Sequence, residues 1–82
     1  MNVLIEPLSS EKVIKMLELE NKMVFRVDRR ARKTDIKKEF EETFKVKVVK
    51  INMQIRNNKK IAYIKLDKKN PAINIATKLG MI

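Results

Sequence analysis

The sequence predicts a small α+β domain in which helices pack on one face of a three-stranded antiparallel sheet, in the order α-β-α-β-β-α. Three segments alternate apolar and polar residues with the two-residue period of a half-buried strand, and three others repeat apolar residues at helical spacing. The chain has 82 residues, of which 44% are hydrophobic, so we expect one compact domain over residues 1–82 with a modest core.

The first half of the chain predicts an arm, a helix and a strand. "MNVLIEP" (1–7) reads as an extended arm, because Pro7 biases the residue before it away from helix. A helix is expected over residues 10–20, with Ser9 or Ser10 as its N-cap, Glu11 in its first turn and Asn21 as its end. "KMVFRVD" (22–28) alternates as a strand whose apolar face is Met23, Phe25 and Val27.

The middle of the chain predicts a second helix and the longest strand. Thr34 is the expected N-cap of this helix, and Ile36, Phe40 and Phe44 form its apolar stripe at a spacing of four residues. Glu39 and Glu42 are expected on its solvated face. "VKVVKINMQIR" (46–56) changes its alternating phase between Val48 and Val49, which predicts a β-bulge there.

The last third predicts a hairpin and a third helix. "NNKK" (57–60) reads as a short turn, because Asn tolerates left-handed backbone, and "IAYIKL" (61–66) returns as a strand. The final helix is expected between Asn70 as N-cap and Gly80 as C-cap, with Pro71 in its first position. The residues of its predicted inner face are Ile73, Ala76 and Leu79.

The composition favours a nucleic-acid partner over catalysis. Lys and Arg number 20 against 10 Asp and Glu, a net charge of +10, which points first to nucleic acid and second to an acidic membrane or protein surface. The chain lacks Cys and His, and Gly80 is its single glycine, so common zinc sites, His- or Cys-based catalysis and a phosphate-cradling glycine loop are not expected. We expect no enzyme, cofactor, metal or membrane insertion, and a cytoplasmic location.

Cationic residues concentrate in "VDRRARKT" (27–34), at a junction between a strand and a helix. Like charges this close repel one another, so the cluster indicates an anionic partner. The uncovered face of the sheet and the hairpin turn are expected to extend this surface, with Tyr63 as a single ring for base stacking. One ring is too few for base-by-base reading, which favours recognition of folded RNA by shape and backbone. The predicted RNA-binding residues are Arg26, Arg29, Arg30, Arg32, Lys33, Lys50, Arg56, Lys59, Lys60, Tyr63 and Lys65.

Two other functions stay open from the residues alone. A small chromatin-type protein could coat DNA through the same charges, since both polymers present phosphates. The absence of a recognition-helix motif counts weakly against it. An acylphosphatase-like enzyme could use a similar small fold, but the missing glycine loop disfavours that reading.

The run "NKMVFRVDRRARKTDIKKEFEETFKVKVVKINMQI" (21–55) followed by "KKIAYIKL" (59–66) resembles the ribosomal protein L23 family, in its short archaeal-type form. "PLSSEK" (7–12) matches that family's Pro-x-x-Ser/Thr-Glu-Lys segment. The resemblance implies a non-catalytic α+β domain bound to large-subunit rRNA at the outer rim of the polypeptide exit tunnel, beside other ribosomal proteins. It also implies transient docking of signal recognition particle or nascent-chain-associated complex, with Glu11 as the docking contact.

The chain departs from the family pattern at two places. Bacterial members carry a long hairpin loop that reaches into the tunnel, whereas "RNNKK" (56–60) closes the hairpin at once. We therefore expect no contact with the nascent chain inside the tunnel. Arg32 stands where the family commonly has a small polar residue, which adds charge to the expected RNA surface.

Overall fold

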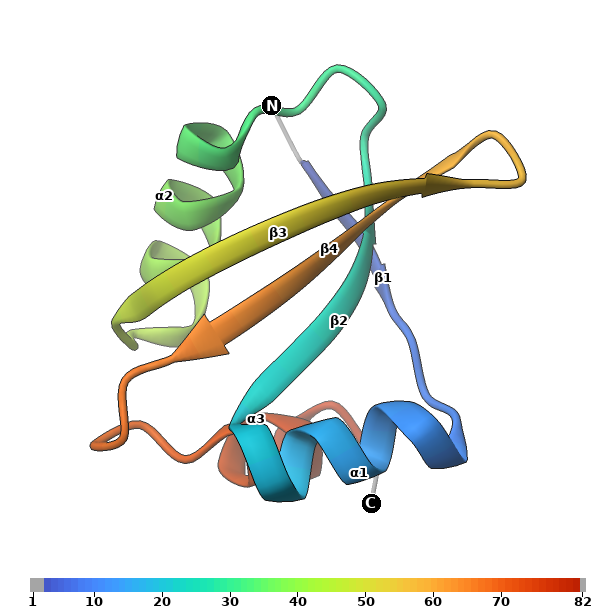
Figure 1. Ribbon diagram of the computed structural model, residues 1–82. Helices are drawn as coiled ribbons and strands as arrows, with labels where there is room; N and C mark the ends of the chain where they lie inside the picture. Colours follow the sequence, from blue (N-terminus) through green and yellow to red (C-terminus); the bar gives the residue numbers. More distant parts are fainter. Residues whose placement is uncertain (1–2, 82) are drawn as a thin grey trace.

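A four-stranded antiparallel sheet with three helices makes up the computed structural model of this protein, which describes residues 3–81 (Figure 1). The strand order across the sheet is β1-β2-β4-β3. Figure 1 shows α2 against one side of the sheet, and α1 and α3 side by side across one end of it. The elements are β1 (Leu4–Pro7), α1 (Glu11–Glu20), β2 (Lys22–Val27), α2 (Lys33–Phe44), β3 (Val48–Arg56), β4 (Lys59–Leu66) and α3 (Ala72–Lys78).

The N-terminal segment is a strand, so the prediction of three strands was wrong. β1 pairs antiparallel with β2, and residues 1–2 of the expected arm lie outside the described part. The amides of Val3 and Leu4 donate to the two carboxylate oxygens of Glu39, at 3.1 and 2.8 Å. Glu39 is therefore used by the fold and is not the merely solvated residue that we expected. Pro7 ends β1 at the edge of the sheet, where a missing amide donor is tolerated.

The main core lies between α2 and one face of the sheet. The predicted stripe is confirmed in Ile36 and Phe40, which are fully buried. The Phe40 ring meets Phe25 of β2 edge-on, with centroids 5.6 Å apart, and Phe44 packs against both rings. Ile64 of β4 is buried in the same cluster. Because strand side chains alternate, this packing sends every second residue of β2 and β4 to the opposite face.

α1 contributes to both faces of the sheet, so the prediction of helices on one face holds only in part. Its Leu17 belongs to the main core. Its Val13 packs against Val24 and Ile61 in a second, smaller apolar cluster. Ile61 lies opposite Arg26, on the polar side of the sheet. The N-terminal half of α1 therefore covers part of the face that we expected to be open.

The ends of α1 and α2 are set by nearby side chains. Ser10 is the N-cap of α1, as predicted, and its hydroxyl accepts from the Val13 amide at 3.2 Å. Arg32, and not Thr34, occupies the N-cap position of α2, so that prediction was wrong. The reason is Asp35, whose carboxylate accepts from the Arg32 amide at 3.0 Å and so fixes the start of the helix earlier.

The start of α3 is capped by Asn21, the residue that follows the end of α1. Pro71, and not Asn70, takes the N-cap position. The first amide of the helix, on Ala72, donates to the Asn21 side chain at 2.6 Å. Asn70 instead accepts from the Lys47 amide at 2.9 Å. The predicted Asn70 cap was therefore wrong, because its side chain is engaged by the segment before β3.

The predictions for α3 hold only in part: Leu79 is the C-cap and Gly80 follows it, and of the predicted inner face only Ala76 is buried. Gly80 has φ +74, and the amides of Gly80 and Met81 close the helix by donating to the carbonyls of Thr77 and Ala76, at 3.1 and 2.9 Å. The buried residues are Ala72, Ile75 and Ala76, while Ile73 and Leu79 are 44% and 37% exposed. This seven-residue helix has two sets of apolar residues at helical spacing. The set that contains Ala72 and Ala76 is the buried one, because small side chains allow the helix to pack more closely.

The β3–β4 hairpin agrees closely with the hairpin predicted from the sequence. The pairing register shifts between Val48 and Lys50, which confirms the predicted bulge. Asn57 and Asn58 both have left-handed backbone, with φ 53 and 63, as a two-residue type I′ turn requires. Lys59 already lies in β4, so the turn is shorter than the four residues that we expected.

We expect Asn21→Ala to destabilise the fold by about 2–3 kcal/mol, because Asn21 joins the end of α1 to the end of β4 and the start of α3. Its amide group donates to the carbonyls of Leu66, Asp67 and Asn70, in addition to capping Ala72. Its φ of 55 is left-handed. Urea unfolding measures the loss.

Asn21→Gly separates the contribution of the side-chain hydrogen bonds from that of the left-handed backbone, since glycine tolerates this backbone and loses only the side-chain hydrogen bonds. The Asn21→Gly variant should lose most of the free energy of unfolding that Asn21→Ala loses. Asn52→Ala, on the exposed surface of β3, is the matched control and should change stability by less than about 0.5 kcal/mol. An Asn21→Gly protein as stable as the wild type would contradict this role.

Candidate nucleic-acid interface

Cationic side chains line up across three strands on the polar side of the sheet. Lys65 of β4 lies directly between Lys22 of β2 and Lys50 of β3. Like charges directly opposite one another destabilise a sheet, so nothing in the strand pairing itself accounts for this row. We call this side the open face; its cationic and aromatic residues are Lys22, Arg26, Lys50, Arg56, Lys59, Tyr63 and Lys65.

Two of these charges are already neutralised by the protein. Arg26 Nε lies 3.1 Å from Glu6 Oε1 of β1, and Lys22 Nζ lies 3.2 Å from Glu20 Oε1 of α1. Over residues 3–81, no carboxylate lies within ion-pair distance of the other four cations of the open face. Those four are available to an external anion, and they are Lys50, Arg56, Lys59 and Lys65.

Gln54 organises the aromatic end of the open face. Its Oε1 accepts from Tyr63 Oη at 3.1 Å and from Arg56 Nη2 at 3.2 Å. The ring and the guanidinium are therefore oriented before any ligand binds. Alternation along β3 puts Gln54 on this face, but no sequence pattern indicates that it connects these two groups.

The basic junction is a turn with its side chains directed outward. The Ala31 amide donates to the Asp28 carbonyl at 3.0 Å, and the Arg30 amide donates to Asp28 Oδ1 at 2.9 Å. Ala31 is fully buried and anchors the turn in the core. We call the exposed residues around it the arginine junction: Arg29, Arg30, Arg32 and Lys33.

Lys60 lies apart from the open face, although the sequence analysis grouped it with Lys59 at the hairpin turn beside that face. It pairs with Val27 and Ile55, on the side of the sheet opposite Tyr63. Its ammonium donates to the carbonyls of Ala31 and Arg29 at 2.7 and 3.3 Å. Lys60 therefore holds the arginine junction in place. Strict alternation along β4 separates it from its neighbour Lys59.

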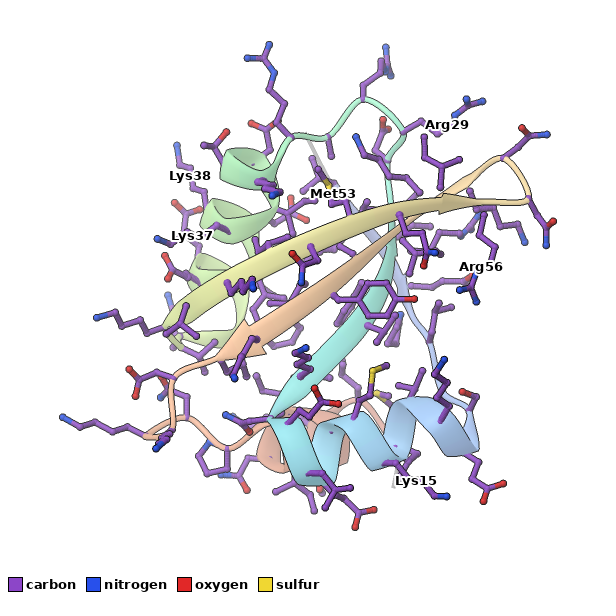
Figure 2. All side chains as sticks on the ribbon, in the orientation of Figure 1. Lys15, Arg29, Lys37, Lys38, Met53 and Arg56 are labelled. Carbon is purple, nitrogen blue, oxygen red and sulfur yellow. The ribbon has the colours of Figure 1, made fainter. Side chains whose placement is uncertain are left out.

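A shallow hollow of about 300 Å³ connects the arginine junction with the hairpin end of the open face. It is lined by Arg26 and Arg29 on one side and by Asn58 and Lys59 on the other. Figure 2 shows Arg29 at the end of the sheet where the hairpin turns. The structure thus brings the two predicted cationic regions together.

Glu11 is highly exposed at the start of α1. Its side chain is 89% exposed, and Oε1 lies 3.8 Å from Lys15 Nζ one turn along the helix. So loose and exposed a pair contributes little to stability. Glu11 is therefore free to contact another molecule.

No helix within residues 3–81 is both long and apolar enough to cross a membrane. In the same range, no three acidic, His or Cys side chains come together in a group that could hold a metal ion.

Comparison with known proteins gives one consistent result. Residues 2–77 match the family described as "Ribosomal protein L23". Similar proteins named "Large ribosomal subunit protein uL23" occur in Methanothermobacter thermautotrophicus, with 41% identity over 96% of this chain and 93% of the relative, and in Picrophilus torridus, with 42% identity over 99% of both. Another from Methanococcus aeolicus is 45% identical over 92% of this chain and 88% of the relative.

We expect Asp28 to titrate below the ordinary carboxyl pKa of 3.8, mainly because the Arg30 backbone amide donates to its carboxylate, with the charges of Arg30 and Lys60 adding to this. Partial desolvation opposes the shift. Since the folded state lowers this pKa, Asp28 stabilises the fold above pH 3.8, and that contribution is lost as the pH falls through the folded value. Carbon-detected NMR titration of the carboxyl group measures the pKa.

Arg30→Ala tests the stated cause of the shift. It removes the guanidinium and keeps the backbone amide, so the pKa of Asp28 should rise only in part. A wild-type pKa at or above 3.8 would contradict this description of the turn, as would full restoration to 3.8 in Arg30→Ala.

Proposed function

The chain belongs to the ribosomal protein L23 family, and from this premise we propose that its open face and arginine junction bind large-subunit rRNA at the outer rim of the polypeptide exit tunnel. The protein is a component of the large ribosomal subunit and not an enzyme. We also propose that it works in the cytoplasm, on the assembled ribosome.

The row formed by Lys22, Lys65 and Lys50 is the observation that carries the proposal. Two of its members have no carboxylate partner among residues 3–81, and their charges face each other across the sheet. Phosphates placed over this row would turn repulsion into attraction and release counterions from the RNA. The arginine junction supplies further cations at the same end of the molecule as the hairpin, and among residues 3–81 only Arg30 of the four has a carboxylate at ion-pair distance, that of Asp28 at 3.6 Å.

Folded RNA fits the open face better than duplex DNA. The cations of the open face and the arginine junction lie on a sheet surface and a turn, except Lys33 at the first position of α2, and they do not run along a helix that could enter a major groove. A sheet surface with one oriented ring suits the wide minor groove and unpaired bases of RNA. DNA coating by a chromatin-type protein is the alternative that a binding competition tests.

We further propose that Glu11 is a docking contact for factors that meet the nascent chain, such as signal recognition particle or nascent-chain-associated complex. Support comes from its place in the "PLSSEK" segment and from its 89% exposed side chain. The two-residue turn at Asn57 and Asn58 supports a position at the rim, since so short a hairpin gives little reach into a tunnel. Neighbouring ribosomal proteins are the other expected partners.

Replacing Arg29, Arg30 and Arg32 together by Ala should weaken rRNA binding and reduce the slope of log affinity against log salt by about 2 to 3, because about 0.7–0.9 counterions are released per lost phosphate contact. A titration against folded large-subunit rRNA over a salt series measures both quantities. The junction side chains are exposed, so the variant should fold normally.

The matched control removes three cations from outside the interface, at Lys15, Lys37 and Lys38. Figure 2 shows these side chains on the outer sides of α1 and α2. This control should keep most of the wild-type affinity. Equal losses in both triple variants would mean that total charge, and not the arginine junction, governs binding. Duplex DNA of equal length should bind more weakly than rRNA at every salt concentration.

Glu11→Lys should reduce binding of purified signal recognition particle to reconstituted ribosomes at least several-fold, because it reverses the charge at the proposed contact. Binding of the variant to rRNA should not fall, since Glu11 lies outside the open face. Glu18→Lys, also exposed on α1, is the control. Co-sedimentation measures the affinities, and an unchanged affinity for Glu11→Lys would remove Glu11 from the docking site.

A further inference from the structure

A groove of about 390 Å³ runs between α1 and the open face, over the second apolar cluster. Its floor is apolar because Ile61 of β4 lies between Arg26 of β2 and Gln54 of β3 in the strand pairing. The loop before α1 and the first two turns of that helix complete the floor. The apolar residues that line the groove are Leu8, Val13, Met16, Val24 and Ile61.

The rim of this groove is strongly cationic. Lys12, Arg56 and Lys59 line it, and within residues 3–81 none of them has a carboxylate at ion-pair distance. Glu6 is the one acidic residue of the lining, and it is paired with Arg26 at 3.1 Å. An occupant that matches the groove therefore combines an apolar group with at least two negative charges.

Tyr63 gives the groove a planar, oriented surface. It packs against the second apolar cluster, and its hydroxyl donates to Gln54 at 3.1 Å. Gln54 also accepts from Arg56, so the ring and one rim cation are held by the same side chain. Aromatic rings that are fixed in this way are suited to stacking on a nucleobase, which has an apolar face whatever its sequence.

We propose that the groove binds one unpaired nucleobase of rRNA, stacked on Tyr63, with the flanking phosphates contacted by Lys12, Arg56 and Lys59. This inference rests on the proposed function and adds a site to it. A nucleotide supplies a planar apolar group and adjacent negative charges in one unit. A protein segment would have to place acidic residues on both sides of an apolar one to match the same rim.

A pair of matched RNA hairpins isolates the contribution of the base. One hairpin carries a single unpaired 2-aminopurine, and the other carries an abasic nucleotide at the same position, so that length and phosphate number are equal. The wild-type protein should bind the first about tenfold more tightly, which is within the range of single base–aromatic stacking. The fluorescence of 2-aminopurine should change on binding, because the base moves onto the Tyr63 ring.

Substitutions at Tyr63 assign this preference to the groove. Tyr63→Leu keeps an apolar side chain and removes the ring, so the ratio of the two affinities should fall to about one while affinity for the abasic RNA is unchanged. Tyr63→Phe keeps the ring and should retain most of the preference. Lys15→Ala is the control on α1, since Figure 2 shows Lys15 pointing away from the sheet. Circular dichroism verifies that each variant is folded.

The outcomes separate this inference from the function on which it rests. Equal binding of the two hairpins by the wild type overturns the base site and leaves rRNA binding intact. If the wild type binds neither of the hairpins and does not bind folded rRNA, the proposed function itself is overturned. Micromolar binding of an acidic, leucine-containing peptide that is lost in Tyr63→Leu, together with equal hairpin affinities, would make the groove a peptide site and also overturns the inference.

Discussion

The packing of α2 against one face of the sheet is the constraint on which the rest of the structure depends. Phe25, Phe40 and Ile64 are buried at this contact, and burial of large side chains is the dominant stabilising contribution in a domain of this size. Once the side chains of that face are buried in the core, the two-residue period of each strand determines which side chains lie on the opposite face. Lys50 and Lys65 are brought together because their neighbours are needed in the core.

The charged surface is held by groups that are not themselves part of it. Ala31 is buried beneath the arginine junction, and Asp28 and Lys60 bind its backbone. Asn21 similarly ties α1, β4 and α3 together at the other end of the sheet. Cationic side chains above these anchors stay exposed, where solvent and salt screen their mutual repulsion. The fold thus tolerates in the free state a charge density that is useful only against a polyanion.

The sequence indicated those features that depend on local pattern. Alternation predicted β2, β3 and β4, and the change of phase at Val48 predicted the bulge, because register follows directly from a two-residue period. β1 was missed because it has four residues and is stabilised by Glu39, which lies 35 positions away from Leu4. The cap of α3 was missed for the same reason, since Asn21 is 51 positions from Ala72.

Of the predicted interface residues, most share the open face or the arginine junction, and Lys60 lies behind them. The groove under α1 depends on how a helix crosses the end of the sheet, which no periodicity encodes.

The most direct test of the account is NMR mapping of backbone amides during titration with a folded fragment of large-subunit rRNA. We expect the largest shift changes along Lys50–Arg56, Lys59–Lys65 and the arginine junction. The outer side of α2, around Lys37 and Lys38, should change little, although it also carries exposed lysines. Changes concentrated on that helix, with the sheet residues unaffected, would contradict the assignment of the open face as the RNA-binding surface.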